Sequence, residues 1–213
     1  MPDLSFRVDR AAAVVYAAAP LLGFSIEITN AAHETIHTII LRCQIRIEPA
    51  RRKYDSDAQI RLLDLFGEPE RWSQTLRSMH WTHAHVVVQG FTGVTAAELQ
   101  VPCTFDFNVA ATKYFYGLKD GEIPLCLMFS GSVFYEDDSG ALQVAPIPWE
   151  KETRFRLPCK IWRDMMDFYY PNCAWLSLRQ DTFDRLYRYK TLHGIPTWEQ
   201  ALDLLIPAEE GVA

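Results

Sequence analysis

Apolar and polar residues alternate along much of the first two thirds of the chain, and a period of two is typical of half-buried β-strands. Residues 41–47 are the clearest case, because their apolar positions alternate with Arg42, Gln44 and Arg46. Residues 123–135 are apolar on both faces, which predicts a central strand. The pattern predicts strands at 24–29, 41–47, 79–91, 101–116, 123–135 and 141–147.

Apolar positions at helical spacing predict two helical regions. The first is a short insertion at about 55–76, which Asp55 or Ser56 can cap at its start. The second lies in residues 151–213, where Thr197 and Gln200 form a capping-box pattern before an apolar run. Helices are predicted there at 162–169, 181–193 and 197–205, and the tail from Pro207 is expected to be frayed.

These elements predict a single domain over residues 1–213, of the α+β class and mainly β. Residues 1–150 are expected to form an antiparallel β-sandwich with the helical insertion, since short turns cannot join parallel neighbours. Residues 151–213 are expected to form a helical segment packed on it. An exposed edge strand could pair with a second copy, which leaves a homodimer open.

Composition narrows the class of protein. The chain has 213 residues, 49% of them apolar, and a net charge of -6, so it can bury a core and lacks the basic surplus of a general nucleic-acid binder. No apolar run reaches the length of a membrane span. Asp3, Asp9 and Pro20 argue against a secretory signal at residues 11–24. Five widely spaced cysteines without a C-x-x-C motif indicate the reducing cytoplasm.

No catalytic motif is evident. Phosphate-binding glycine loops are absent, and Ser130-Gly131-Ser132 lacks the first glycine of a hydrolase nucleophile elbow. Asp106 would be a candidate only if it were buried. We therefore expect a protein that is not an enzyme and has no cofactor, and a small ligand-binding protein or enzyme using Asp106 or Ser130–Ser132 remains an alternative.

A histidine-rich segment suggests a metal site. His80, His83 and His85 lie in one predicted strand, where His83 and His85 share a face and His80 points to the other. Imidazole binds nickel and zinc, and His33 or His37 could supply a further ligand. A metal-binding protein is therefore an alternative function, against the simpler reading of a solvated sheet edge.

Two groups of residues suggest a protein-binding surface. One is the polar face of the strand at 41–47, formed by Arg42, Gln44 and Arg46. The other is the aromatic and arginine-rich C-terminal third, in which Trp175, Tyr187 and Arg188 are candidates. Aromatic residues and arginine are enriched at the centres of protein interfaces, although short helices also need aromatic residues for their core.

Several segments together resemble a known protein family. They include LRCQIRIEPARRKYD, LLDLFGEPERW, VPCTFDFNVAATKYFYGLKDGEIPL, FSGSVFY, YYPNCAWLSL and DTFDRLYRYK. The chain is similar over most of its length to a bacterial family catalogued as a domain of unknown function. The resemblance implies an association with gene clusters of actinobacterial-type, oxygen-tolerant nickel–iron hydrogenases. It supports a non-enzymatic accessory protein whose partner is a hydrogenase subunit or maturation factor.

Overall fold

The computed structural model describes residues 2–206, and the chain forms two compact units, Met1–Cys173 and Ala174–Ala213. Two compact units can belong to one domain or to two, so the single domain expected from the sequence stays a prediction. The first unit contains the strands and five of the α-helices. No helix among the described residues is long and apolar enough to cross a membrane.

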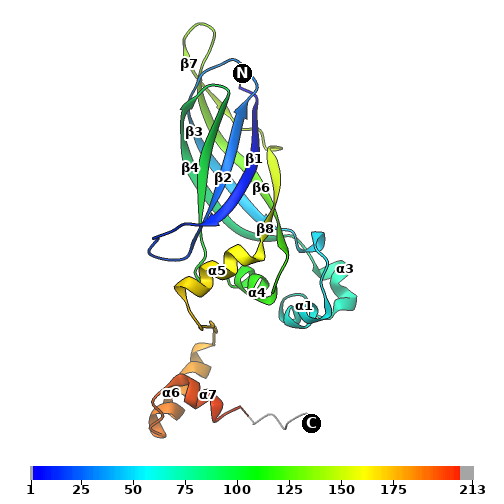
Figure 1. The fold of residues 1–213 in the computed structure, drawn as a ribbon, viewed down its shortest axis with the longest axis vertical. Coiled ribbons are helices and arrows are strands. Elements are labelled where there is room, and N and C mark those ends of the chain that lie inside the picture. The colour runs from blue at the N-terminus through cyan, green and yellow to red at the C-terminus, as the bar shows by residue number, and fades with distance from the viewer. Residues whose placement is uncertain (1, 207–213) are drawn as a thin grey trace. The chain divides into compact units, whose positions relative to one another are not determined.

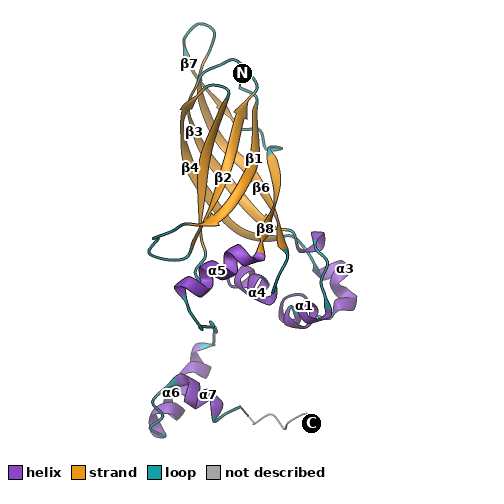
Figure 2. Ribbon diagram, in the orientation of Figure 1, coloured by secondary structure: helices purple, strands orange, loops and turns teal. Residues whose placement is uncertain are grey.

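The first unit contains two antiparallel sheets (Figures 1 and 2). The smaller sheet has the order β1-β2-β5 and consists of β1 (Leu4–Ala13), β2 (Leu21–Asn30) and β5 (Val94–Pro102). Its middle strand buries Leu22, Phe24, Ile26 and Ile28 at every second position, as the alternation predicts.

The larger sheet has the order β4-β3-β6-β7, with β8 also paired to β6. Its strands are β3 (Ile36–Ile47), β4 (Met79–Phe91), β6 (Glu122–Glu136), β7 (Leu142–Pro146) and β8 (Glu152–Pro158). The long strand β6 pairs with β8 through its first half and with β7 through its last five residues. The central strand predicted at 123–135 is therefore confirmed.

One hydrophobic cluster joins the two sheets. Phe6 of the smaller sheet stacks on Phe129 of the larger one, with ring centroids 4.3 Å apart. Phe24 makes edge contacts with Trp81 at 6.2 Å and with Phe155 at 6.1 Å. The expected α+β, mainly β fold with antiparallel sheets is confirmed.

The helices of the first unit lie at one end of the strands (Figure 1). The predicted insertion contains η1 (Pro49–Arg51), α1 (Ser56–Arg61), α2 (Leu63–Phe66), η2 (Pro69–Arg71) and α3 (Trp72–Thr75). Asp55 caps α1 by accepting a hydrogen bond from the backbone N–H of Ala58 at 2.7 Å. The hydroxyls of Tyr54 and Tyr114 hydrogen-bond at 2.8 Å and connect the insertion to α4 (Val109–Gly117).

Two of the elements predicted for this unit are wrong. Only residues 101 and 102 of the strand predicted at 101–116 lie in a strand, at the end of β5. α4 begins after Asn108, whose side chain accepts a hydrogen bond from Ala111 N at 3.1 Å. A good N-cap residue thus overrides the apparent alternation. Helical structure was expected from residue 151 onward, but β8 precedes α5 (Cys159–Tyr169), because an edge of β6 is available for pairing.

The second unit contains α6 (Gln180–Leu192) and α7 (Trp198–Asp203), which confirms the two predicted helices. Thr197 caps α7 by accepting a hydrogen bond from Gln200 N at 3.2 Å. No residue of α6 is buried. Phe183, Tyr187 and Trp198 instead form a partly exposed aromatic cluster. The predicted frayed tail lies outside the described residues.

Candidate functional site: the outer face of the larger sheet

Strands β3 and β4 bring two groups of predicted site residues onto one exposed face. Directly opposite residues of an antiparallel pair project to the same side of the sheet. The register pairs each predicted partner-binding residue of β3 with a histidine of β4. We call this set the basic face, and its three rows are Arg46 with His80, Gln44 with His83, and Arg42 with His85.

A β-bulge places His80 on this face. The register shifts after Ile45, which lies opposite Thr82, whereas Arg46 lies opposite His80. Trp81 and Thr82 are consequently both buried, and the ring of His80 lies 4.5 Å from that of His83. The prediction that His80 points to the opposite face is therefore wrong, because the bulge adds one residue to the strand.

The permanent charge of the basic face comes from two arginines. Among the residues that the structure describes, neither Arg42 nor Arg46 forms an ion pair. The side-chain amide of Gln44 lies 3.4 Å from Nδ1 of His80. Partial burial lowers the pKa of His80, and His83 and Arg46 lower it further. His80 is therefore mainly neutral near pH 7, and the permanent positive charge belongs to the guanidinium groups of the two arginines.

On β6 and β8, the side chains of this face that lie beside Arg46 are neutral or paired with carboxylates. Cys126 lies opposite Arg46 on one side and opposite Arg154 on the other. Burial, followed by the carboxylate of Glu152, raises the pKa of Cys126 to about 11, so its thiol is neutral. Arg154 contacts Glu152 at 3.6 Å and Glu48 at 3.9 Å. The unpaired positive charge is thus concentrated on β3.

An exposed apolar surface continues the same face beyond Arg42. Ile40 lies opposite Val87, and the two side chains are 44% and 58% exposed. Val144 of β7 is 59% exposed and pairs with Phe134 of β6. We call Ile40, Val87 and Val144 the apolar extension. The alternation of polar and apolar positions did not predict these residues, although the unbroken apolar runs around Ile40 and Val87 indicate side chains on both faces.

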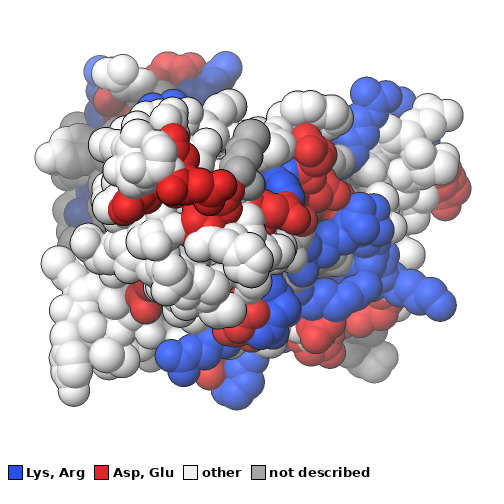
Figure 3. All heavy atoms as spheres, turned by 90° about the horizontal axis from the view of Figure 1, so that it is seen from above, with Lys and Arg blue, Asp and Glu red and all other residues white. Residues whose placement is uncertain are grey.

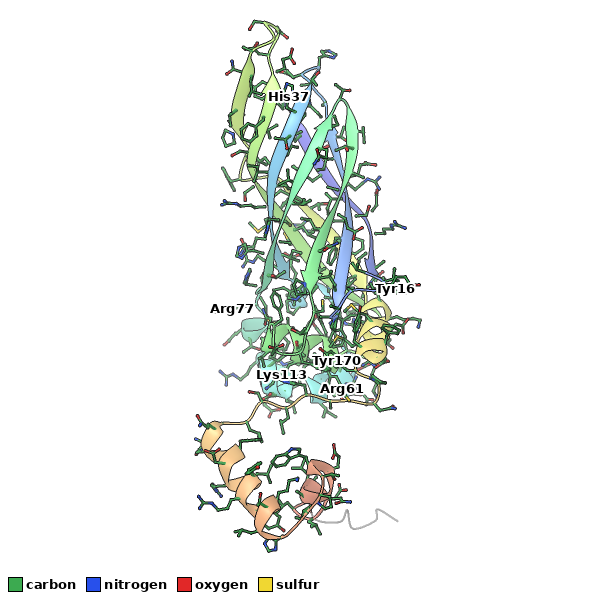
Figure 4. All side chains as sticks on the ribbon, turned by 90° about the vertical axis from the view of Figure 1, so that its left-hand side faces the viewer. Tyr16, His37, Arg61, Arg77, Lys113 and Tyr170 are labelled. Atoms are coloured by element: carbon green, nitrogen blue, oxygen red, sulfur yellow. The ribbon has the colours of Figure 1, made fainter. Side chains whose placement is uncertain are left out.

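The predicted metal site stays a prediction. Within residues 2–206, no group of three or more His, Cys, Asp and Glu side chains is positioned to hold a metal ion. His37, considered as a further ligand, lies near the far end of the sheets from the helices (Figure 4). It faces Glu136, with Nε2 3.3 Å from the carboxylate, and so belongs to a different part of β3 from the basic face.

The second unit holds the remaining predicted partner-binding residues. Trp175 is 39% exposed and precedes α6, while Tyr187 and Arg188 are exposed on α6. Tyr187 packs beside Trp198, with ring centroids 6.0 Å apart, and Lys190 lies 5.4 Å from the centroid of Trp198. These residues form an aromatic surface of their own.

The residues considered for a ligand or catalytic site do not form a pocket together. Asp106 is exposed in the turn before α4, so it lacks the burial that would have made it a candidate. Ser130 is exposed and Ser132 is half-buried, on the outer face of β6. A groove of about 500 Å³ lies elsewhere, between the 11–16 segment and α5. Its lining is mainly apolar and includes Tyr16, Tyr169 and Asp164, which pairs with Lys160.

Comparisons with solved structures give only weak similarities. A late embryogenesis abundant protein matches 74% of this chain and 72% of its own, with 13% identity and a TM-score of 0.32. The ApaA protein from Bordetella pertussis matches 74% and 95%, with 14% identity and a TM-score of 0.30. A β-glucosidase from Kluyveromyces marxianus matches 73% of this chain and 15% of its own, with 8% identity and a TM-score of 0.25. At these scores the similarities carry no argument about function.

Sequence comparison identifies the family. No curated protein matches the chain significantly. A family profile described as a family of unknown function, DUF6084, matches residues 1–213. This agrees with the resemblance to a domain of unknown function seen in the sequence. The chain therefore belongs to the DUF6084 family.

Proposed function

We propose that this protein is a non-enzymatic accessory protein that binds a protein partner through the basic face. The observation that carries the proposal is that Arg42 and Arg46 are unpaired among the described residues and lie on one sheet face. Two unpaired guanidinium groups can donate to carboxylates in a fixed fork geometry. In this proposal the two sheets act as a rigid sandwich that presents the basic face.

The aromatic surface of the second unit supplies a second contact in this proposal. Tyr187 is 56% exposed and Phe183 is 44% exposed. α6 buries no residue, so an apolar helix face remains available to a partner. Trp175 and Arg188 add the residue types that dominate binding energy at interfaces.

The family resemblance supplies the finer part of the proposal. A hydrogenase subunit or maturation factor of the nickel–iron type is the proposed partner, and the cytoplasm is the proposed location. This step rests on the association with hydrogenase gene clusters that the family resemblance implies, while the chemistry of the surface supports only a protein partner.

Affinity purification from the native host tests the proposal. The wild-type protein, the double variant Arg42→Glu/Arg46→Glu and a control variant Arg10→Glu are compared at physiological salt. Arg10 is exposed on β1 of the other sheet and forms no ion pair among the described residues, so Arg10→Glu makes the same kind of charge reversal at one site without touching the basic face.

We expect a hydrogenase subunit or maturation factor to be recovered with the wild type and with Arg10→Glu, and to be lost with the double variant. Recovery of the same partner with the double variant would contradict a role for the basic face. Recovery of a partner unrelated to hydrogenases would contradict the finer identification alone.

A further inference from the structure

We infer that the basic face and the apolar extension together recognise a helix of a partner protein that carries carboxylates in its first turns and aliphatic side chains in the next. The inference rests on the proposed function and specifies the partner's chemistry. It follows from the order of side chains along β3, from the pairing of that strand and from the distribution of charge around it.

The order of side chains along β3 divides the surface into a charged half and an apolar half. Side chains on one face of a strand repeat about every 6.7 Å. Arg46 and Arg42 are therefore about 13 Å apart along β3, and Ile40 follows Arg42 after one further repeat. Val87 lies beside Ile40, so the apolar half spans at least two strands. A partner must therefore place carboxylates against the two guanidinium groups and apolar side chains against the aliphatic residues directly beyond Arg42.

The pairing of β3 favours a helix over an extended segment. β3 is hydrogen-bonded to β4 on one side and to β6 on the other, so its face offers no free backbone groups to a partner. An extended peptide on this face would leave its own backbone groups without protein partners, at a cost in free energy. A helix satisfies its backbone internally and needs only side-chain contacts.

Helical spacing matches the surface. Residues i and i+8 of a helix project about 80° apart on one half of its surface and are about 12 Å apart along the axis, close to the separation expected for Arg46 and Arg42. Residues i+11 and i+12 lie about 17–18 Å from the first and approach Ile40 and Val87. A helix aligned with β3 therefore places two carboxylates and then an aliphatic pair against the two halves of the surface.

Charge complementarity decides the class of partner. A second copy docked by a two-fold axis would set this surface against itself, so that arginines would meet arginines or the apolar extension. Like charges repel, and an arginine buried against Ile40 would lose its hydration without gaining a counter-ion. An acidic segment avoids both penalties.

The acidic end of the molecule supports this placement of the partner's carboxylates. β6 ends at Glu136, the turn after it carries Asp137 and Asp138, and Figure 3 shows acidic side chains gathered at that end of the molecule. The apolar extension lies between this end and the arginines. The carboxylates of the partner are therefore drawn to the helix-proximal half of β3, away from the acidic turn.

Synthetic peptides test the inference directly. The matched probe is a 20-residue helical peptide with Glu at positions 4 and 12 and Leu at positions 15 and 16 of an otherwise Ala, Gln and Lys sequence. The first control replaces both Glu residues by Gln, and the second scrambles the same composition so that Glu and Leu no longer follow one another on one face. Binding to the 213-residue chain is measured by fluorescence anisotropy at low and physiological salt.

We expect the matched peptide to bind wild type at least about tenfold more tightly than either control peptide. Arg42→Glu/Arg46→Glu and, separately, Ile40→Ser/Val87→Ser should each weaken binding about tenfold, whereas Arg10→Glu should leave it unchanged. Circular dichroism and thermal unfolding verify that each variant is folded.

Equal binding of the matched and scrambled peptides, or no binding of either, would overturn the inference about the partner's chemistry. The proposed function would still stand if a captured partner depends on Arg42 and Arg46. If a captured partner is indifferent to both arginines while the matched peptide binds through them, the proposed function fails and the chemical preference of the surface holds.

Discussion

Gly131 of β6 is the position at which one added methyl group should damage the larger sheet most. It lies opposite Leu41 of β3 and has φ of +137°, and a Cβ there would be 2.0 Å from the carbonyl oxygen of Ile40. The obstructing atom belongs to the backbone of a strand paired on both sides. A side-chain rotation cannot relieve the clash, so one strand must move.

The magnitude follows from two contributions. A side chain held at positive φ costs about 1–2 kcal/mol relative to glycine. Moving β6 away from β3 near Ile40 weakens about two ladder hydrogen bonds, each worth about 1 kcal/mol. Gly131→Ala should therefore lower the free energy of unfolding by about 3–4 kcal/mol, a large fraction of the 5–15 kcal/mol typical of a domain.

Gly140→Ala is the matched control. Gly140 has φ of +80°, but the nearest atom to its added Cβ is Glu136 Oε1 at 3.5 Å, which is an ordinary contact. This variant should lose only the backbone contribution of about 1–2 kcal/mol. Urea unfolding followed by circular dichroism compares the two variants. Equal losses would refute the reasoning, because the close approach of β6 to β3 would then cost nothing.

Three further predictions concern single side chains. Brief alkylation under native conditions should modify Cys173 alone, because its thiol is exposed while burial raises the pKa of Cys43 and Cys103 to about 12. Mass spectrometry identifies the modified residue, and rapid modification of either buried thiol would contradict the packing. Hydrogen bonds from Ser139, Ala141 and Gln143 lower the pKa of Asp137 to about 2 from 3.8, so its stabilisation of the β6–β7 turn should be complete above pH 4 and lost as the pH falls through 2. Hydrogen exchange of the β7 amides as a function of pH measures this stabilisation. An unchanged pH dependence of exchange in Asp137→Ala would refute the role of Asp137. Tyr114→Phe should lower the free energy of unfolding by about 1 kcal/mol, because Tyr54 keeps its second hydrogen bond, to the carbonyl of Pro49. Urea unfolding measures this loss, and a loss several times larger would contradict the estimate of one hydrogen bond.

Local patterns predicted the elements whose residues alternate or cap cleanly. Residues 41–47 lie in β3 as expected, and the cap at Thr197 begins α7 as the sequence indicates. β1 was not predicted, because its sequence combines charged residues with a run of alanines and buries only Leu4, Val8 and Ala11. An edge strand of this kind is stabilised by pairing with β2 more than by its own pattern.

The site could be predicted only in part, because its geometry depends on tertiary packing. The sequence identified the exposed residues of β3 and the histidines of β4 separately. These residues lie opposite one another only because of the register between the two strands, and His80 joins the same face only because of the bulge at Trp81. Trp81 packs against Phe115, with ring centroids 4.9 Å apart, and Phe115 comes from α4, a helix in a segment whose pattern predicts a strand. The face on which His80 lies therefore depends on a contact with a residue that is distant in the sequence.

Site-specific photocrosslinking in the native host tests the central claim most directly. A photoreactive amino acid replaces Gln44 at the centre of the basic face, and in a control it replaces Glu27, which lies on β2 of the other sheet and pairs with Arg7. The account predicts a discrete crosslinked partner from position 44, absent from position 27 and lost when Arg42 and Arg46 are both changed to Glu. A partner crosslinked equally from both positions, or from position 27 alone, would contradict the assignment of the basic face as the binding surface.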